Sequence, residues 1–181
     1  MKKFAEKTIN SQEIYSGKVV HLQVDDVILP NGKQAKREII NHPGAVAIIP
    51  ITKDKKIVMV EQYRKPLEKS LLEIPAGKLE PGEDPETTAI RELEEETGYT
   101  TNELSLVTSF YTSPGFANEL MYIYITDQLE RVDEPAEGDD DEFIQIVEVT
   151  LDEAKQYVEE ERIHDSKTNY AILYLHALGM S

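Results

Sequence analysis

Three glutamates, Glu92, Glu95 and Glu96, have the type and spacing in this 181-residue chain that most clearly point to chemistry. At 100° per residue they fall within an arc of about 100° on one helix face. Like charges at this spacing cost a helix about 0.2–0.5 kcal/mol per pair, so a compensating cation is expected. Arg91 can pair with Glu95, but one guanidinium cannot neutralise three carboxylates. Mg²⁺ or Mn²⁺ can, because both prefer oxygen ligands. A solvated acidic surface is the alternative, and it is our interpretation of Glu94.

The helix that positions these glutamates has clear start and stop signals in the sequence. Asp84 is suited to be an N-cap, Pro85 to the first helical position and Gly98 to the terminator. These signals predict a helix over 84–98. Its apolar stripe, beside the glutamates, consists of Ala89, Ile90 and Leu93.

The remaining elements predict an α/β (α+β) chain in two parts. Residues 1–43 are expected to form a β-rich appendage with a hairpin turn at Asn31-Gly32, and residues 44–181 the main domain. Further strands and helices are expected at 19–29, 38–40, 45–51, 56–62, 103–110, 119–126, 143–149, 151–162 and 167–178. In the last helix, core packing is predicted for the residues that recur at helical spacing, Tyr170, Leu173, Tyr174 and Ala177.

Composition excludes several classes of protein. The chain has no cysteine, which excludes a disulfide scaffold, a thiolate zinc site and a cysteine nucleophile. No apolar run approaches the roughly 20 residues that span a bilayer, and no signal-peptide stretch follows Met1, so we expect a cytoplasmic protein without a membrane partner. A net charge of −16 argues against nucleic acid binding. Any anionic substrate therefore needs a cation between itself and the protein.

The glutamate helix and the Gly- and Pro-containing loop before it match the pattern G-x5-E-x7-R-E-U-x-E-E-x-G-U at every fixed position. The matching residues are Gly77, Glu83, Arg91, Glu92, Leu93, Glu95, Glu96, Gly98 and Tyr99. This pattern is the Nudix box, and through it the chain resembles the Nudix hydrolases. The resemblance implies the Nudix fold, an α/β/α sandwich around a mixed β-sheet, and hydrolysis of a nucleoside diphosphate linked to another group.

The resemblance also implies roles for individual residues. Mg²⁺, or alternatively Mn²⁺, would be bound by Glu92, Glu95, Glu96 and the backbone carbonyl of Ala76. Arg91 would orient a box glutamate, and Glu83 would help to hold the loop. The metal would neutralise pyrophosphate oxygens and position an attacking water.

Residues outside the box resemble the ADP-ribose pyrophosphatase subfamily. The similar stretches are 60–66 and 72–77, together with Pro114, sixteen residues beyond Gly98. This resemblance implies hydrolysis of ADP-ribose to AMP and ribose 5-phosphate. The substrate-binding residues expected from it are Arg37, Arg64, Ser113, Gly115, Phe116 and Glu119. A plain surface arginine is the alternative for Arg64, and a solvated residue at the start of a strand is the alternative for Glu119.

The same subfamily suggests a general base and an oligomeric state. Glu142 ends the acidic run 139–142 and precedes a strand, at the place where the subfamily carries a loop glutamate that acts as base. Glu95 and Glu96 are the competitors, because some Nudix enzymes use a box glutamate. In the subfamily the appendage exchanges between two protomers, so a homodimer is expected, although an edge covered within one chain is equally allowed.

Three other functions remain open at this point. Another nucleoside diphosphate derivative, such as an ADP-sugar, NADH or a dinucleotide polyphosphate, is the alternative substrate. A non-catalytic Nudix domain that senses nucleotides would be expected to lose its metal carboxylates, but all three glutamates are present. An acidic scaffold protein would explain neither the loop glycines nor the spacing of the box.

Overall fold

The computed structural model describes residues 3–133 and 143–180, and these divide into two compact units. The first unit comprises Met1–Gly44 together with Phe110–Met121, and the second comprises Ala45–Ser109 and Tyr122–Ser181. The sequence divides the chain near the same place, at residues 43 and 44, but it does not indicate that the later segment Phe110–Met121 joins the N-terminal unit.

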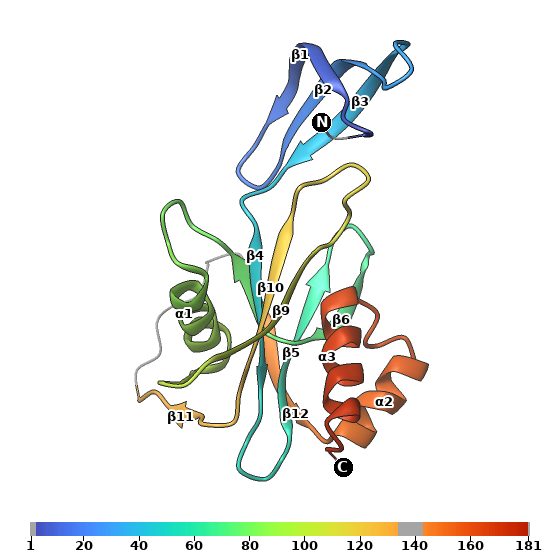
Figure 1. The fold of residues 1–181 in the computed structure, drawn as a ribbon. Helices are drawn as coiled ribbons and strands as arrows, with labels where there is room; N and C mark the ends of the chain where they lie inside the picture. The colour runs from blue at the N-terminus through green and yellow to red at the C-terminus, as the bar shows by residue number, and fades with distance from the viewer. Residues whose placement is uncertain (1–2, 134–142, 181) are drawn as a thin grey trace. The chain divides into compact units, whose positions relative to one another are not determined.

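The first unit is built on an antiparallel three-stranded sheet. Its strands are β1 (Lys7–Ser16), β2 (His21–Ile28) and β3 (Gln34–Asn41), with β2 in the middle; they are drawn in blue in Figure 1. The turn between β2 and β3 places Gly32 at a φ of 82°, as the Asn-Gly pair predicts. Ile40 of β3 exchanges backbone hydrogen bonds with Phe116 and Asn118, and this pairing attaches the segment Phe110–Met121 to the sheet.

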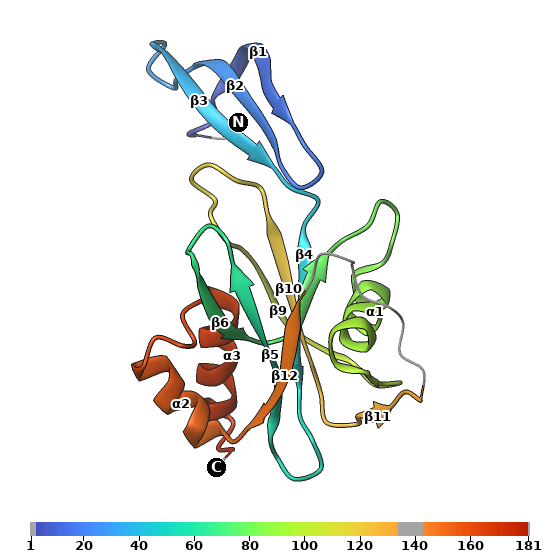
Figure 2. The same ribbon diagram turned by 180° about the vertical axis from the view of Figure 1, so that it is seen from behind.

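The second unit is layered, with helices on both sides of its strands (Figures 1 and 2). One sheet has the order β7-β4-β10-β9, another the order β12-β5-β6, and β11 pairs with β8. The strands are β4 (Ala45–Pro50), β5 (Ile57–Arg64), β6 (Lys69–Glu73), β7 (Ala76–Lys78), β8 (Tyr99–Thr100), β9 (Ser105–Tyr111), β10 (Leu120–Thr126), β11 (Glu130–Arg131) and β12 (Ile144–Val149). The last two residues of β9 and the first two of β10 lie within Phe110–Met121 and so belong to the first unit.

In the described part of the chain, three helices cover these strands. Helix α1 (Pro85–Thr97) lies on one side, and α2 (Leu151–Glu159) and α3 (Ser166–Ala177) lie on the other. The α/β/α layering predicted from the sequence is therefore confirmed. Among residues 3–133 and 143–180, no helix combines the length and the apolar character that a bilayer crossing requires.

The start and stop signals of α1 act as predicted. The Asp84 side chain accepts a hydrogen bond from the backbone N–H of Glu86, and Pro85 is the first helical residue. Gly98 ends the helix in the left-handed conformation, with a φ of 67°. Two residues of the predicted apolar stripe, Ala89 and Leu93, are completely buried and fix the rotation of α1 about its axis.

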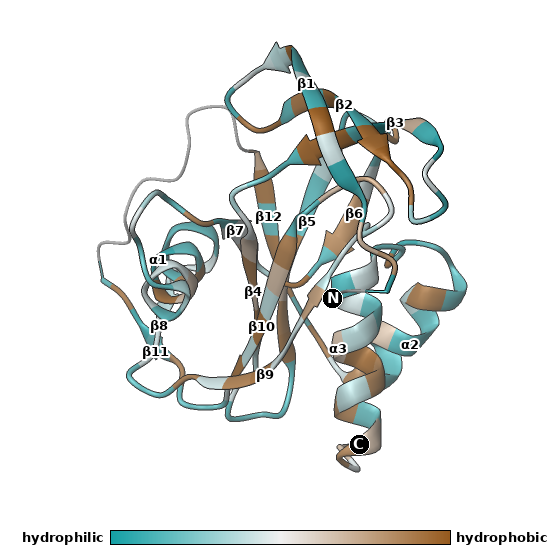
Figure 3. Ribbon diagram, turned by 45° about the horizontal axis from the view of Figure 1, so that its top comes forward, coloured by the Kyte–Doolittle hydropathy of each residue, from teal (hydrophilic) through white to brown (hydrophobic). Residues whose placement is uncertain are grey.

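The core of the second unit lies beneath α1 and along the central strands. Ala89 and Leu93 pack in one cluster with Val46, Ile48 and Tyr124 of β4 and β10. Figure 3 shows hydrophobic residues along β4 inside this unit and hydrophilic residues in the outer loops. Because the apolar stripe of α1 faces this core, the glutamates beside the stripe are carried to the edge of the sheet at β7.

The core prediction for the last helix is wrong. Leu173 is 68% exposed and Ala177 is also exposed, whereas Tyr170 and Tyr174 are half-buried and stack on each other, with ring centroids 6.3 Å apart. The buried positions of α3 follow the same helical spacing on a neighbouring face. They are Thr168, Ala171, Ile172 and Leu175, and Lys167 beside them is also buried.

Candidate active site

Arg91 lies at the centre of the carboxylate cluster on α1. Its Nη1 donates to Glu92 Oε1 at 3.0 Å and to Glu95 Oε2 at 2.9 Å. The opposite edge of the guanidinium faces Glu83 in the preceding loop, with Nη2 3.2 Å from Glu83 Oε2. The predicted pairing of Arg91 with Glu95 is therefore present, and one arginine links the loop to two of the helix carboxylates.

Charge and hydrogen bonding stabilise this arrangement in the ionised state. Partial burial by itself would lower the pKa of Arg91, but the hydrogen bond to Glu83 and the charges of Glu92 and Glu95 raise it above its usual value. Hydrogen bonds from Arg91 and from the Thr88 hydroxyl lower the pKa of Glu83. Thr88 is completely buried in α1, so Glu83 is held from the helix by a side chain that cannot turn away into solvent.

The remaining carboxylates of the helix lie against β7. The backbone N–H of Ala76 donates to Glu96 Oε2 at 3.1 Å, and Glu96 is 5% exposed. A methyl group on Gly77 would overlap the carboxylate of Glu92, so Glu92 occupies the space that a side chain would otherwise fill. Glu92 and Glu96, one helical turn apart on α1, thus lie against two adjacent backbone positions of β7.

The residues at this edge have the donor chemistry that a hard divalent cation needs. Carboxylate oxygens of Glu92 and Glu96 and the backbone of Ala76 meet where glycine leaves room, and Glu95 is tied to Glu92 through Arg91. Within the described ranges, no three His, Cys, Asp or Glu side chains already surround a common point. The carboxylates of Glu92 and Glu95 are instead directed to Arg91.

Arg64 lies on β5 and forms a paired ion bridge. Its Nε and Nη2 donate to the two carboxylate oxygens of Glu73 at 2.7 and 2.8 Å. This hydrogen bonding raises the pKa of Arg64, and the charges of Glu96 and Asp165 act in the same direction. Burial would raise the pKa of Glu73, but Arg64 and Lys167 lower it overall. Arg64 is therefore a fixed cation beside the carboxylate cluster, and not a loosely solvated surface arginine.

The other predicted substrate-binding residues belong to the first unit. Arg37 on β3 forms a two-point ion pair with Glu6, with its Nη2 2.6 Å from Glu6 Oε1. Glu119 accepts a hydrogen bond from the Thr112 hydroxyl at 2.5 Å, and its other oxygen lies 3.9 Å from His42 Nδ1. Glu119 is therefore anchored at the end of its loop.

The loop between Thr112 and Glu119 is compact but exposed at its tip. The Ser113 carbonyl accepts backbone hydrogen bonds from Phe116 and Ala117. Phe116 is 54% exposed, and a methyl group on Gly115 would meet no neighbour within 4 Å. The predicted base, Glu142, lies outside the residues that the structure describes.

Sequence reasoning assigned no role to Lys167 and none to Glu73 beyond the motif that contains it. Glu73 is buried and accepts hydrogen bonds from both Arg64 and Lys167. A signal was available, because Glu73 interrupts the apolar run 71–74, and a buried carboxylate requires partners. The sequence contained no comparable signal to show that Lys167 would be the second cation bonded to Glu73.

Comparisons with known proteins show the family of this chain. The model of the NUDIX domain matches residues 41–169, and that of the nucleoside diphosphate sugar hydrolase N-terminal domain matches residues 6–40. A solved structure described as an ADP compounds hydrolase superposes with a TM-score of 0.84 over 97% of both chains, at 23% identity, and so supports the fold.

Two curated relatives cover nearly the whole chain. A methanol dehydrogenase activator from Bacillus methanolicus is 61% identical over 96% of this chain and 94% of its own length. An ADP-ribose pyrophosphatase from Bacillus subtilis is 56% identical over 97% of this chain and 95% of its own length. With the family model matching more than half of the chain and a relative 56% identical over nearly its whole length, the protein belongs to the Nudix hydrolase family.

Proposed function

We propose that this chain is an ADP-ribose pyrophosphatase that hydrolyses ADP-ribose to AMP and ribose 5-phosphate in a metal-dependent reaction. The observation that carries the hydrolytic part is the convergence of Glu92 and Glu96 on the adjacent residues Ala76 and Gly77. The substrate is supported by the 56% identical relative that bears this name. Nudix hydrolases use divalent metal ions, and Mg²⁺, with Mn²⁺ as a substitute, suits the all-oxygen donors.

We assign the metal to Glu92, Glu95, Glu96 and the carbonyl oxygen of Ala76. When bound there, the metal would supply Lewis-acid stabilisation of the negative charge on the pyrophosphate. Arg91 orients the carboxylates of Glu92 and Glu95 through its hydrogen bonds, and Glu83 holds Arg91 from the loop side. The acidic helix thus becomes a site for an anionic substrate only when a cation neutralises it.

We assign binding of the substrate to two groups of residues. Arg64 supplies a fixed positive charge for a phosphate or ribose hydroxyl. In the first unit, the residues proposed to contact the substrate are Arg37, Ser113, Gly115, Phe116 and Glu119. Phe116 has an exposed aromatic ring, and the anchored carboxylate of Glu119 can accept hydrogen bonds from ribose hydroxyls.

We propose Glu142 as the general base that activates the attacking water. Glu142→Gln keeps the size of the side chain and removes the carboxylate, so kcat should fall by about 10²–10⁴ while metal affinity changes little. Steady-state kinetics combined with a Mn²⁺ titration measures both quantities. Asp140→Asn in the same acidic run is the matched control and should retain the wild-type rate. Full activity in Glu142→Gln would assign the base to Glu95 or Glu96 instead.

A substrate panel tests the proposed specificity. ADP-ribose, an ADP-sugar, NADH and a dinucleotide polyphosphate are compared by kcat/KM at one fixed Mg²⁺ concentration, because this ratio measures discrimination between substrates. ADP-ribose should have the highest value. A higher value for another compound would replace ADP-ribose as the substrate and would leave the hydrolytic mechanism intact.

We also propose that the protein is a homodimer. The strand β1 is exposed along its whole length, and an unprotected edge of a sheet is a surface to which another chain can pair. Light scattering after size-exclusion chromatography should give twice the chain mass of 20.6 kDa. A mass of one chain at micromolar concentration would contradict the proposal.

A second candidate function is activation of a methanol dehydrogenase, and the 61% identical relative with that name favours it. The rate of methanol oxidation by a methanol dehydrogenase is measured with and without this protein. An increase with the wild-type protein that disappears with Glu96→Gln would show that activation depends on hydrolysis. No increase with the wild-type protein would reject this candidate.

A further inference from the structure

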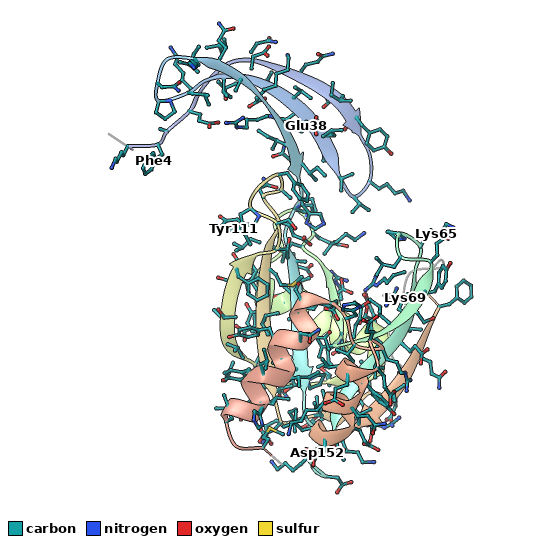
Figure 4. All side chains as sticks on the ribbon, turned by 90° about the vertical axis from the view of Figure 1, so that its right-hand side faces the viewer. Phe4, Glu38, Lys65, Lys69, Tyr111 and Asp152 are labelled. Atoms are coloured by element: carbon teal, nitrogen blue, oxygen red, sulfur yellow. The ribbon has the colours of Figure 1, made fainter. Side chains whose placement is uncertain are left out.

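A network of four charged side chains connects helix α3 to the hairpin formed by β5 and β6. Its members are Arg64, Glu73, Asp165 and Lys167, and all of them lie in the second unit. Their formal charges sum to zero. Figure 4 labels Lys65 and Lys69, which mark the turn that joins the strand with Arg64 to the strand with Glu73.

The position of Arg64 is set by Glu73. Only one edge of the guanidinium, made of Nε and Nη2, is used in the two bonds to the Glu73 carboxylate. Nη1 lies outside this fork. Glu73 is 2% exposed whereas the Arg64 side chain is 37% exposed, so the buried carboxylate is the anchor and the arginine is the group that reaches toward solvent. A two-point bridge of this kind fixes the plane of the guanidinium.

The position of Glu73 is set in turn by the first turn of α3. Lys167 Nζ donates to Glu73 Oε2 and, at 3.0 Å, to Asp165 Oδ1. Asp165 is also the N-cap of α3, since its Oδ1 accepts from the backbone N–H of Thr168 at 3.1 Å. The Lys167 side chain is only 11% exposed. Lys167 is therefore held by the helix cap at one side and presents its charge to Glu73 at the other.

A second bond from α3 holds the segment that follows Glu73. The buried hydroxyl of Thr168 accepts from the backbone N–H of Ile74 at 3.1 Å. Two residues later, Ala76 donates to Glu96. One short stretch, residues 73–76, thus links Arg64, the start of α3 and the carboxylate cluster of α1, and its location depends on α3.

We propose that Lys167 is a positioning residue for Arg64, acting through Glu73, and that it thereby sets the affinity of the site for the phosphate-bearing substrate. This inference rests on the proposed function for the identity of the substrate. The ion pairs of Lys167 are with Glu73 and Asp165, neither of which is a proposed metal ligand. Its role is to neutralise part of the negative charge of Glu73. The Glu73 carboxylate then orients the Arg64 guanidinium but does not pull it away from the solvent-facing position.

Removal of the lysine charge should change substrate binding more than the chemical step. In Lys167→Met the network carries a net charge of −1, and Arg64 becomes the only cation left in the network for the two carboxylates, Glu73 and Asp165. The guanidinium should then turn inward. Because a hydrogen bond to a charged group is stronger than a neutral one, its loss should raise KM for ADP-ribose by about 10-fold or more, while kcat should fall by less than about 3-fold. Lys167→Arg keeps the charge and should restore most of the affinity.

A double-mutant cycle tests whether Lys167 acts through Arg64. KM and kcat are measured for wild type, Lys167→Met, Arg64→Met and the double variant, and the dissociation constant of α,β-methylene ADP-ribose is measured by calorimetry. If the proposal holds, Lys167→Met has little further effect on either constant once Arg64 is gone. Independent, additive losses in KM would overturn it. Lys155→Met, which removes a surface lysine paired with Asp152 on α2, is the matched control.

Folding of the variants is measured separately by thermal unfolding. If Lys167→Met is too unstable to assay, Glu73→Gln/Lys167→Met removes both charges of the buried pair, a change that is often neutral for stability. That variant should fold and still show the raised KM, because the neutral amide no longer holds Arg64; a wild-type KM would overturn the proposal. Failure of the wild-type protein to hydrolyse ADP-ribose would reject the proposed function, whereas an active wild type with an additive cycle would reject only the role of Lys167.

Discussion

Glu96→Gln is expected to abolish ADP-ribose hydrolysis while leaving the protein folded. The amide oxygen of glutamine can still accept the hydrogen bond from the N–H of Ala76, so the contact between α1 and β7 survives. The negative charge at the proposed metal site does not. Because a bound metal supplies several kcal/mol of charge stabilisation, kcat/KM should fall by about 1,000-fold or more. The rate is measured by AMP release at saturating Mg²⁺.

Glu94→Gln is the matched control for this prediction. It makes the same chemical change on the same helix, at a residue that we interpret as part of the solvated face. Its activity should stay within about 2-fold of wild type. If Glu96→Gln and Glu94→Gln lost activity equally, the effect would come from the overall charge of α1, and the assignment of Glu96 to the metal would be contradicted.

Gly77→Ala should also cause a large loss of activity, by a steric route. The added methyl group overlaps the Glu92 carboxylate, so that side chain must leave its place beside β7. The backbone of Gly77 has no positive φ that would make alanine strained, and the group that must move is the flexible end of a glutamate. We expect metal affinity and kcat/KM to fall by about 100-fold, the scale of a misplaced reacting group, with little change in melting temperature.

Gly82→Ala is the control, because it should lower stability while activity is retained. Gly82 has a φ of 85° and no atom within 4 Å of the position of an added methyl group. Alanine there should cost about 1–2 kcal/mol of stability, because an L-residue is strained in this conformation, while most of the activity should remain. If both variants lost only stability, or only activity, the contact between Gly77 and Glu92 would not be the cause.

The helix that carries the box was predictable because its signals are local. Asp84, Pro85 and Gly98 act through their own backbone and capping chemistry, and none of them needs a distant partner. The pairing of Arg91 with Glu95 is equally local, since four residues along a helix place two side chains on one face. The role of Gly77 was only implied by the motif, and the structure adds its physical reason, which is the space taken by Glu92.

Elements with weak or ambiguous patterns were not predictable. The strand β1 is exposed at every position and has no hydrophobic alternation, so it carries no periodic signal. In α3, two neighbouring stripes both satisfy helical spacing, and the sequence favoured the one with the larger side chains. The structure buries the stripe that contains Thr168, whose hydroxyl accepts a hydrogen bond from the backbone N–H of Ile74. A hydrogen bond between residues that are 94 positions apart in the sequence cannot be predicted from the local spacing of hydrophobic residues.

The charged network was beyond sequence reasoning for the same reason. Arg64 and Glu73 face each other because the hairpin register places Arg64 opposite Lys69 and Glu73 opposite Val60, which brings both side chains to one face of the sheet. Lys167 arrives from the C-terminal helix, again 94 residues away from Glu73. Only the packing of α3 determines that Lys167, rather than another lysine, neutralises Glu73.

The central claim is that the carboxylates at β7 hold a metal that permits hydrolysis of ADP-ribose. The most direct measurement is chromatographic separation of the products after the purified protein is incubated with ADP-ribose and Mg²⁺. We predict equal amounts of AMP and ribose 5-phosphate, loss of both when EDTA is added, and recovery when excess Mg²⁺ or Mn²⁺ is restored. Unchanged ADP-ribose in the presence of the metal, or equal product formation with EDTA, would contradict the account.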